Sequence, residues 1–178
     1  MYLCAKLMRI MKKADLLPQG VVLIQLPHNV DERGHLAFLE GGTHIPFEVK
    51  RVFWIYGVPE GKTRGGHAHW TCHEAIFPVA GSFEIELDDG QRNVTLVMDD
   101  PLKGITVPAG VWCELRNFAP GTVCVVMASQ EYDAKGYALN REEWKKGLKI
   151  EILKIENSSD SLSLEEAAKP SGKLKSEK

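Results

Sequence analysis

The sequence predicts an all-β fold, an antiparallel barrel or sandwich with short helices near its ends. Apolar runs of strand length recur between residues 21 and 130, turn residues separate them, and no stretch of that region keeps a helical period. Many short strands without intervening helices are typical of antiparallel sandwiches and barrels. The expected strands are Val21–Leu26, Leu36–Glu40, Val49–Tyr56, Ala75–Val79, Phe83–Leu87, Val94–Met98, Ile105–Val107, Val111–Leu115 and Val123–Ala128.

The other elements follow in order along the chain. Residues 1–20 are expected to form an N-terminal extension with a short amphipathic helix, because Lys and Arg interrupt its apolar positions. The strand at Phe83–Leu87 alternates apolar and acidic residues, so one face contacts water, and Asp89-Gly90 after it is a strong hairpin turn. Near the end, Arg141–Leu148 is expected to form a short helix, and Ile150–Ile155 alternates once more.

Length and charge limit the class of protein. With 178 residues, of which 44% are hydrophobic, the chain is long enough for one domain and too short for two full ones. We expect a β-barrel domain over residues 21–156 and a disordered polar tail over 157–178, where Ser, Glu and Lys dominate. A net charge of -2 provides no basic field, so neither nucleic acid nor a membrane is an expected partner.

Cysteine use and hydropathy indicate the compartment. The four cysteines show neither paired C-x-x-C spacing nor the density of a small secreted scaffold, which favours a reducing environment. No apolar run approaches the roughly 20 residues of a membrane span. Basic residues also interrupt the N-terminal apolar positions before a signal-peptide core can form. We therefore expect a cytoplasmic protein.

The most informative feature is a spaced group of glycine, histidine and glutamate. Gly61 is followed after five residues by His67-x-His69, after four more by Glu74, and after six more by Gly81. Alternation along a strand places both histidines on one face, and a following hairpin strand can bring Glu74 beside them. Two imidazoles and a carboxylate are thus expected to converge.

A second spaced group follows, and the two together resemble the paired signatures of the cupin barrel. This group reads Pro108-x-Gly110-x-x-Cys113-x-x-x-Asn117, with Cys113 where the cupin pattern has histidine. The resemblance implies a cupin fold, a double-stranded β-helix or jelly-roll barrel, with the histidines in the barrel mouth.

Two chemistries suit this group, and the residue types leave both open. His67, His69, Glu74 and Cys113 are donors that first-row divalent metals accept, with open positions for a substrate. Without a metal, the imidazoles would move protons directly, because the pKa of histidine lies near operating pH. The simplest explanation of Cys113 is a buried, inert thiol.

Further stretches match a narrower group of cupins, in order, between about residues 22 and 137. They are Asp31-x-Arg33-Gly34-x-Leu36, Phe47-x-Val49-Lys50-Arg51-Val52, Arg64-Gly65-x-His67-Ala68-His69, Gly81-Ser82-Phe83 with Leu87-Asp88-Asp89-Gly90, Val111-Trp112-x-Glu114, and Val126-Met127-Ala128-Ser129 before Tyr132-Asp133. In these stretches the chain resembles the WxcM-like cupins, which include the dTDP-4-keto-6-deoxyglucose 3,4-ketoisomerases of deoxysugar and surface-polysaccharide biosynthesis.

This resemblance implies an isomerase that needs no cofactor and acts on a nucleotide-linked sugar, which we expect to be dTDP-linked. Epimerisation is the related reaction that such a site could also catalyse. It also implies a homodimer with N-terminal strands exchanged between subunits. A base removes the proton beside the ketone, an enediol forms, and a proton returns to the former carbonyl carbon. His67 and His69 match the family's catalytic histidines. The candidates for substrate binding are Arg64, Arg51, Gly65, Trp54 and Trp112.

Three positions depart from the family pattern. The family's tyrosine-bearing strand reads Arg-Val-Tyr-Tyr-Ile, whereas this chain has Phe53-Trp54 at its centre, which makes Tyr56 the candidate for the catalytic hydroxyl. Glu74 stands where the metal-free ketoisomerases have glutamine, and Cys113 replaces a histidine, so a divalent metal stays possible. The alternatives are a metal-dependent cupin enzyme acting on a small ligand and a non-catalytic sugar-nucleotide binder.

Overall fold

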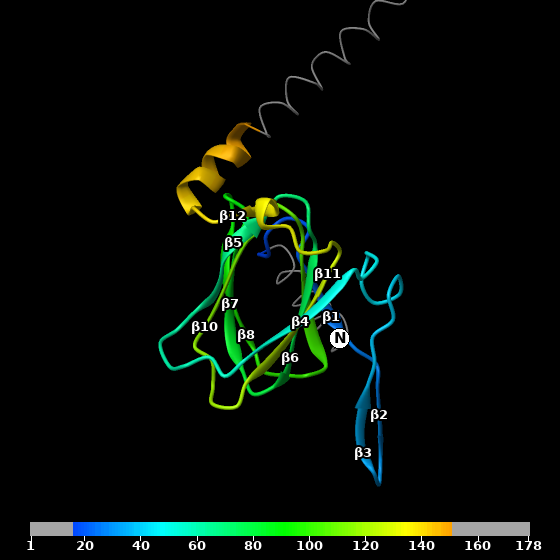
Figure 1. The fold of residues 1–178 in the computed structure, drawn as a ribbon. Helices are drawn as coiled ribbons and strands as arrows, with labels where there is room; N and C mark the ends of the chain where they lie inside the picture. Colours follow the sequence, from blue (N-terminus) through cyan, green and yellow to red (C-terminus); the bar gives the residue numbers. More distant parts are fainter. Residues whose placement is uncertain (1–15, 151–178) are drawn as a thin grey trace, which may run out of the picture. The chain divides into compact units, whose positions relative to one another are not determined.

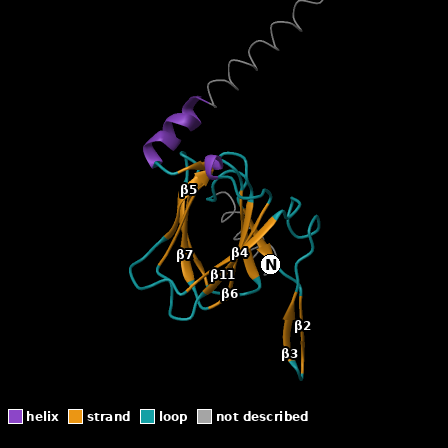
Figure 2. Cartoon of the chain, viewed as in Figure 1, coloured by secondary structure: helices purple, strands orange, loops and turns teal. Residues whose placement is uncertain are grey.

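The computed structural model describes residues 16–150, and the chain divides into two compact units, residues 1–141 and 142–178. Within the described part of the first unit, the strands form two five-stranded antiparallel sheets and one separate hairpin (Figure 1). The two sheets face each other and loops join their strands (Figure 2). The predicted all-β jelly-roll fold is confirmed.

The first sheet has the strand order β1-β9-β6-β11-β4, and the second has the order β12-β5-β10-β7-β8. The bounds in the first sheet are β1 Val22–Gln25, β9 Lys103–Val107, β6 Glu74–Ala80, β11 Val123–Ala128 and β4 Arg51–Tyr56. The bounds in the second are β12 Tyr137–Ala138, β5 Arg64–His69, β10 Trp112–Arg116, β7 Phe83–Asp88 and β8 Asn93–Met98. The hairpin consists of β2 His28–Asp31 and β3 Gly34–Ala37.

Alternation along the strands supplies the core between the sheets. Phe83, Ile85 and Leu87 of β7 are at most 1% exposed, whereas the acidic residues between them are half-buried on the other face. Ile105 and Val126 reach the same core from the first sheet. Burying each such side chain stabilises the fold by about 1.5–3 kcal/mol. The wet face expected for the strand at Phe83–Leu87 is therefore present.

The hairpin of β2 and β3 differs from the prediction, which placed a strand at Leu36–Glu40. Every residue of both strands is exposed, and the hairpin extends away from the two sheets (Figure 1). β2 was not predicted, because His28-Asn29-Val30-Asp31 has no apolar run that would mark a buried strand. It is instead held by pairing with β3 across the turn before Gly34.

The end of the first unit carries two short elements that position the site. A 3₁₀ turn at Ala134–Gly136 is capped by Asp133, whose side chain accepts a hydrogen bond from the amide of Lys135. The two-residue strand β12 follows at once and pairs with β5. No prediction named β12, because two residues are too few to show alternation.

A helix begins at residue 141 and is described as far as 150, so the short helix predicted at Arg141–Leu148 is confirmed. The amphipathic helix expected within residues 1–20, the alternating segment after Ile150 and the polar tail at 157–178 lie almost wholly outside the described residues. The domain bounds of 21–156 stay a prediction. Among the described residues, no helix is long and apolar enough to cross a membrane.

Candidate active site

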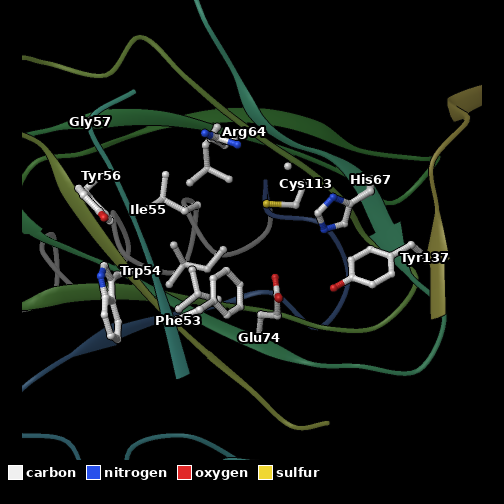
Figure 3. A pocket seen from close by; sticks show the side chains of 14 residues that line it. Phe53, Trp54, Ile55, Tyr56, Gly57, Arg64, His67, Glu74, Cys113 and Tyr137 are labelled. Carbon is white, nitrogen blue, oxygen red and sulfur yellow. The ribbon is translucent and has the colours of Figure 1, made fainter. Parts of the chain in front are cut away.

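A cavity of about 660 Å³ opens inside the barrel, between β4, β5, β6 and β10. This volume lies within the range of roughly 300–1,000 Å³ that is usual for small-ligand sites. His67, Cys113, Tyr137 and Glu74 gather at one end, and Trp54 and Tyr56 lie at the other (Figure 3). The lining residues that carry the chemistry are Arg64, His67, Glu74, Cys113 and Tyr137.

A glycine pair sets the direction of the histidine strand. In the pairing of β5 with β10, Cys113 lies opposite His67 but Glu114 lies opposite Gly65, so Gly66 is an extra residue in β5. Both glycines have positive φ, 75° and 68°, a region that glycine adopts without strain. Because of this bulge, Arg64 and His67 both line the cavity, although a regular strand would place them on opposite faces.

The two histidines and Glu74 converge, but not through the predicted hairpin, because β5 and β6 belong to different sheets and Glu74 reaches His69 from the facing sheet. The rings of His67 and His69 lie edge to face, with centroids 5.0 Å apart. Nε2 of His69 lies 3.2 Å from Oε1 of Glu74, the first residue of β6, and both side chains are less than 10% exposed. A carboxylate only accepts hydrogen bonds, so His69 is the donor in this buried pair.

His67 is held in its neutral form by its surroundings. Burial lowers the pKa of His67 below its ordinary value, and the nearby His69 lowers it further. The negative charge of Glu74 acts in the opposite direction without cancelling these effects. A neutral imidazole that lines a cavity can accept a proton, which is what a general base requires.

Two cysteines near the site are buried, and one of them, Cys113, lines the cavity. Burial raises the pKa of Cys113 well above its ordinary value and raises that of Cys124 to about 12, and Glu74 raises both further. Both side chains are therefore neutral thiols at physiological pH. The thiolate is the form that attacks electrophiles and binds metals, so Cys113 would have to lose its proton to take either role.

The structure adds Tyr137, which sequence reasoning did not select. It lies opposite His69 in the pairing of β12 with β5. Its ring centroid is 4.9 Å from that of His67 and 4.4 Å from that of His69. Nη1 of Arg51 donates a long hydrogen bond of 3.5 Å to the Tyr137 hydroxyl. The only sequence signal was the position of this tyrosine after the strongly polar turn at 133–136.

Tyr56, predicted to be catalytic, and three of the predicted substrate-binding residues divide into two groups. Arg64 and Gly65 line the cavity, and the Arg64 side chain is exposed at its edge. Trp54 and Tyr56 lie far from the histidines, at the other end of the cavity (Figure 3), and are 61% and 65% exposed. They occupy the exposed face of β4, opposite that of Phe53, so Tyr56 does not offer its hydroxyl to His67.

Trp112 is not in the cavity. Cys113 lines the cavity, so alternation directs its neighbour Trp112 to the other face of β10. The tryptophan is 4% exposed, and the guanidinium carbon of Arg141 lies 5.6 Å from its ring centroid. A side chain this buried has no free ring face on which a nucleotide base could stack, so Trp112 supports the barrel wall.

The alternative metal set was tested against the geometry. Within residues 16–150, no three or more His, Cys, Asp or Glu side chains are arranged to hold a metal ion. Glu74 and His69 are paired with each other, and Cys113 is a neutral thiol. The four residues share one region, but their arrangement is that of a hydrogen-bonded acid–base group.

Comparisons with known proteins identify similar chains. The model of the family described as FdtA: WxcM-like, C-terminal matches residues 19–149. Over 117 residues the chain is 34% identical to the TDP-4-oxo-6-deoxy-alpha-D-glucose-3,4-oxoisomerase of Aneurinibacillus thermoaerophilus, a match that covers 66% of this chain and 84% of that protein.

Solved structures agree with this relationship. The sugar 3,4-ketoisomerase QdtA from Thermoanaerobacterium thermosaccharolyticum, in complex with TDP, is similar with a TM-score of 0.73 at 32% identity, covering 76% of this chain and 98% of that one. A 3,4-ketoisomerase from Helicobacter canadensis is similar with a TM-score of 0.72 at 30% identity, covering 74% of this chain and 99% of that one.

Proposed function

Because the chain belongs to the FdtA family of WxcM-like proteins, we propose that it is a sugar-nucleotide 3,4-ketoisomerase acting on a TDP-linked 4-keto-6-deoxyhexose. The single observation that carries the proposal is a neutral, cavity-lining His67 beside the buried pair of His69 and Glu74. Isomerisation of a ketone needs a base at the carbon beside the carbonyl, and His67 is that base.

The reaction moves one proton between neighbouring carbons. His67 takes the proton from the carbon beside the ketone, the electron pair of that bond forms a carbon–carbon double bond, and the carbonyl electrons move to oxygen. The resulting enediolate oxygen takes the proton of the neighbouring hydroxyl. The former carbonyl carbon then receives the proton that His67 carries, and the neighbouring oxygen becomes that of the new ketone. A positioned acid–base group contributes about 10²- to 10⁴-fold in rate to such steps.

His69 is proposed to support His67 in its role as the base. It is less exposed than His67 and is bonded to Glu74, so its orientation is fixed before substrate binds. Its proximity lowers the pKa of His67, which favours the unprotonated base. The Glu74 carboxylate lines the cavity as well, and it holds the hydrogen on Nε2 of His69.

The nucleotide is proposed to lie at the open edge of the cavity. Arg64 is exposed there and presents a planar donor fork that suits a diphosphate. Gly65 supports the turn that aims Arg64 into the cavity. Trp54 is exposed and lines the end of the cavity away from the histidines, where it would contact the nucleoside.

The reaction is proposed to need no metal ion. The support is chemical: His67 is neutral, His69 and Glu74 bond to each other, and Cys113 is a neutral thiol. Enzyme dialysed against a chelator should therefore keep its full rate. Loss of the rate on chelation, with recovery on adding one divalent metal, would instead support a metal-dependent cupin enzyme.

A homodimer with exchanged N-terminal strands is part of the proposal. The hairpin of β2 and β3 exposes Val30 and Leu36 by 57% and 58%, and an isolated two-stranded hairpin is only marginally stable. β4 lies at the end of its sheet and exposes Val52, Trp54 and Tyr56 beside an edge that pairs with no other described strand. Pairing the hairpin of one subunit with β4 of the other would cover both surfaces.

A cytoplasmic location is also proposed. Cys72, Cys113 and Cys124 are buried free thiols in the described part of the chain. Such use of cysteine agrees with a reducing compartment.

Replacing the base tests the proposal. His67→Asn should reduce kcat by about 10²-fold or more, and proton exchange at the sugar should fall equally. His73→Asn is the matched control, because His73 is exposed and does not line the cavity. Full activity of a folded His67→Asn protein would contradict the assignment of the base.

A further inference from the structure

Strand β4 lines the cavity but brings no hydroxyl to the histidines, because its Tyr56 lies at the other end of the cavity (Figure 3). Phe53 and Ile55 of β4 pack against the core between the sheets, whereas Tyr56 is 65% exposed on the other face. An oxyanion that forms during enolisation needs a hydrogen-bond donor beside the base. β4 does not supply that donor.

Tyr137 occupies the place where such a donor is needed. Of the tyrosines in the described part of the chain, it is the one whose ring touches both His67 and His69. Its ring packs against both imidazoles. Figure 3 shows its hydroxyl pointing into the cavity on the side of Glu74. β12 fixes this position, because its backbone pairs with that of His69.

Arg51 orients the hydroxyl. Its guanidinium carbon lies 5.1 Å from the ring centroid of Phe53 and 5.6 Å from that of Tyr132, and Nη1 reaches the oxygen of Tyr137. Its Nε is buried and makes no hydrogen bond within residues 16–150. A hydroxyl that accepts a hydrogen bond from a cation keeps its own hydrogen free to donate, and the positive charge strengthens that donation.

We propose that Tyr137 is a catalytic residue that donates a hydrogen bond to the substrate's carbonyl oxygen, and that Arg51 positions it. This proposal rests on the proposed ketoisomerase function. As His67 removes the carbon-bound proton, electrons move through the new double bond to the carbonyl oxygen. The Tyr137 hydroxyl stabilises the negative charge on that oxygen and keeps its own proton at the end of the cycle.

The test is Tyr137→Phe, which removes one oxygen and keeps the ring that packs against the histidines. Loss of a donor that acts on a developing oxyanion lowers kcat by about 10²- to 10³-fold, and KM should change less than threefold because the bond strengthens only in the transition state. The matched control is Tyr132→Phe, since the Tyr132 ring also lies near Arg51 but is 70% exposed. It should keep kcat within twofold.

A second variant tests whether Arg51 acts only by positioning the Tyr137 hydroxyl. Arg51→Met should lower kcat in the wild-type background and have almost no further effect in the Tyr137→Phe background, because it acts through the hydroxyl. Additive losses would overturn the role of Arg51.

The outcomes also separate this proposal from the function on which it rests. An active wild-type enzyme with a fully active Tyr137→Phe variant overturns the assignment of Tyr137 alone. A folded wild-type protein that neither isomerises TDP-4-keto-6-deoxyglucose nor exchanges its protons overturns both.

Discussion

Replacing Gly65 by alanine, which adds one methyl group, tests whether the bulge in β5 sets the direction of the His67 side chain. Gly65 has a φ of 75°, and a Cβ there would lie 2.6 Å from the carbonyl oxygen of Cys113 on the neighbouring strand. Gly66 has a φ of 68°, but a Cβ there would meet only Oε2 of Glu114, at 3.9 Å. The two alanine variants thus share the backbone strain and differ in the clash.

The expected magnitudes follow from these contacts. Placing alanine in the left-handed region costs about 1–2 kcal/mol, which is the whole effect expected for Gly66→Ala. Gly65→Ala carries the same strain plus an overpacking cost of about 1–3 kcal/mol, because the contacted atom belongs to the backbone. At about 2–4 °C per kcal/mol for a chain of this size, Gly65→Ala should have the lower Tm by roughly 2–12 °C.

Thermal unfolding followed by circular dichroism measures the Tm values, and kcat is measured on the same samples at a temperature where both are folded. Gly65→Ala should also lose more kcat than Gly66→Ala, since moving β5 away from β10 displaces His67. Equal Tm values for the two variants would refute the close approach of β5 to the Cys113 carbonyl. A larger fall in Tm for Gly66→Ala than for Gly65→Ala would refute the bulge itself.

Three further predictions concern the charge, the thiol and the dimer. Burial and His69 lower the pKa of His67, so the plateau of kcat/KM should extend below pH 6.5, and kcat/KM should fall only when the pH drops below that lowered pKa. In His69→Asn this fall should occur at a higher pH. An unchanged pH–rate profile would contradict the effect of His69 on the pKa of His67. Burial raises the pKa of Cys113, so iodoacetamide should label it in urea but not in the native enzyme, as mass spectrometry of its peptide would reveal; rapid native labelling would contradict its burial. Trp54→Glu should convert the dimer to a monomer, as measured by light scattering. Trp70→Glu should not, because Trp70 is 41% exposed but lies outside β4. Equal particle masses for the two variants in solution would contradict pairing through β4.

The shared face of the two histidines was predictable because its geometry is local: His67 and His69 are two residues apart on β5. The predicted hairpin was wrong, since β5 and β6 belong to different sheets and Glu74 reaches His69 from the facing sheet. The bulge at Gly65 and Gly66 was not predicted, although glycine is the residue that adopts a positive φ without strain. The family pattern added the order of the remaining landmarks.

Tyr137 was not predictable from local pattern. Its strand has only two residues, and its position beside His69 depends on a backbone pairing between segments far apart in the chain. The residues around it, Asp133 to Gly136, indicate a turn but not which strand follows or what that strand pairs with. A tertiary contact of this kind has no periodicity for a sequence to reveal.

Tyr56 and Trp112 show a second limit. Alternation tells which residues share a face, and Trp54 with Tyr56 do share one, but it does not tell which face turns toward the cavity. Apolar Phe53 and Ile55 pack into the core, whereas Trp54 and Tyr56 reach only the end of the cavity away from the histidines. For Trp112 the same rule places Cys113 inward, so only one of these neighbours could line the site.

Proton NMR of TDP-4-keto-6-deoxyglucose in deuterated buffer, with chelator-treated enzyme, tests the central claim most directly. The account predicts loss of the signal of the proton beside the ketone together with new signals of a 3-keto sugar, at a rate that His67→Asn reduces. An unchanged sugar spectrum over a folded enzyme, shown by circular dichroism of the same sample, would contradict the claim that His67 catalyses a metal-independent ketoisomerisation.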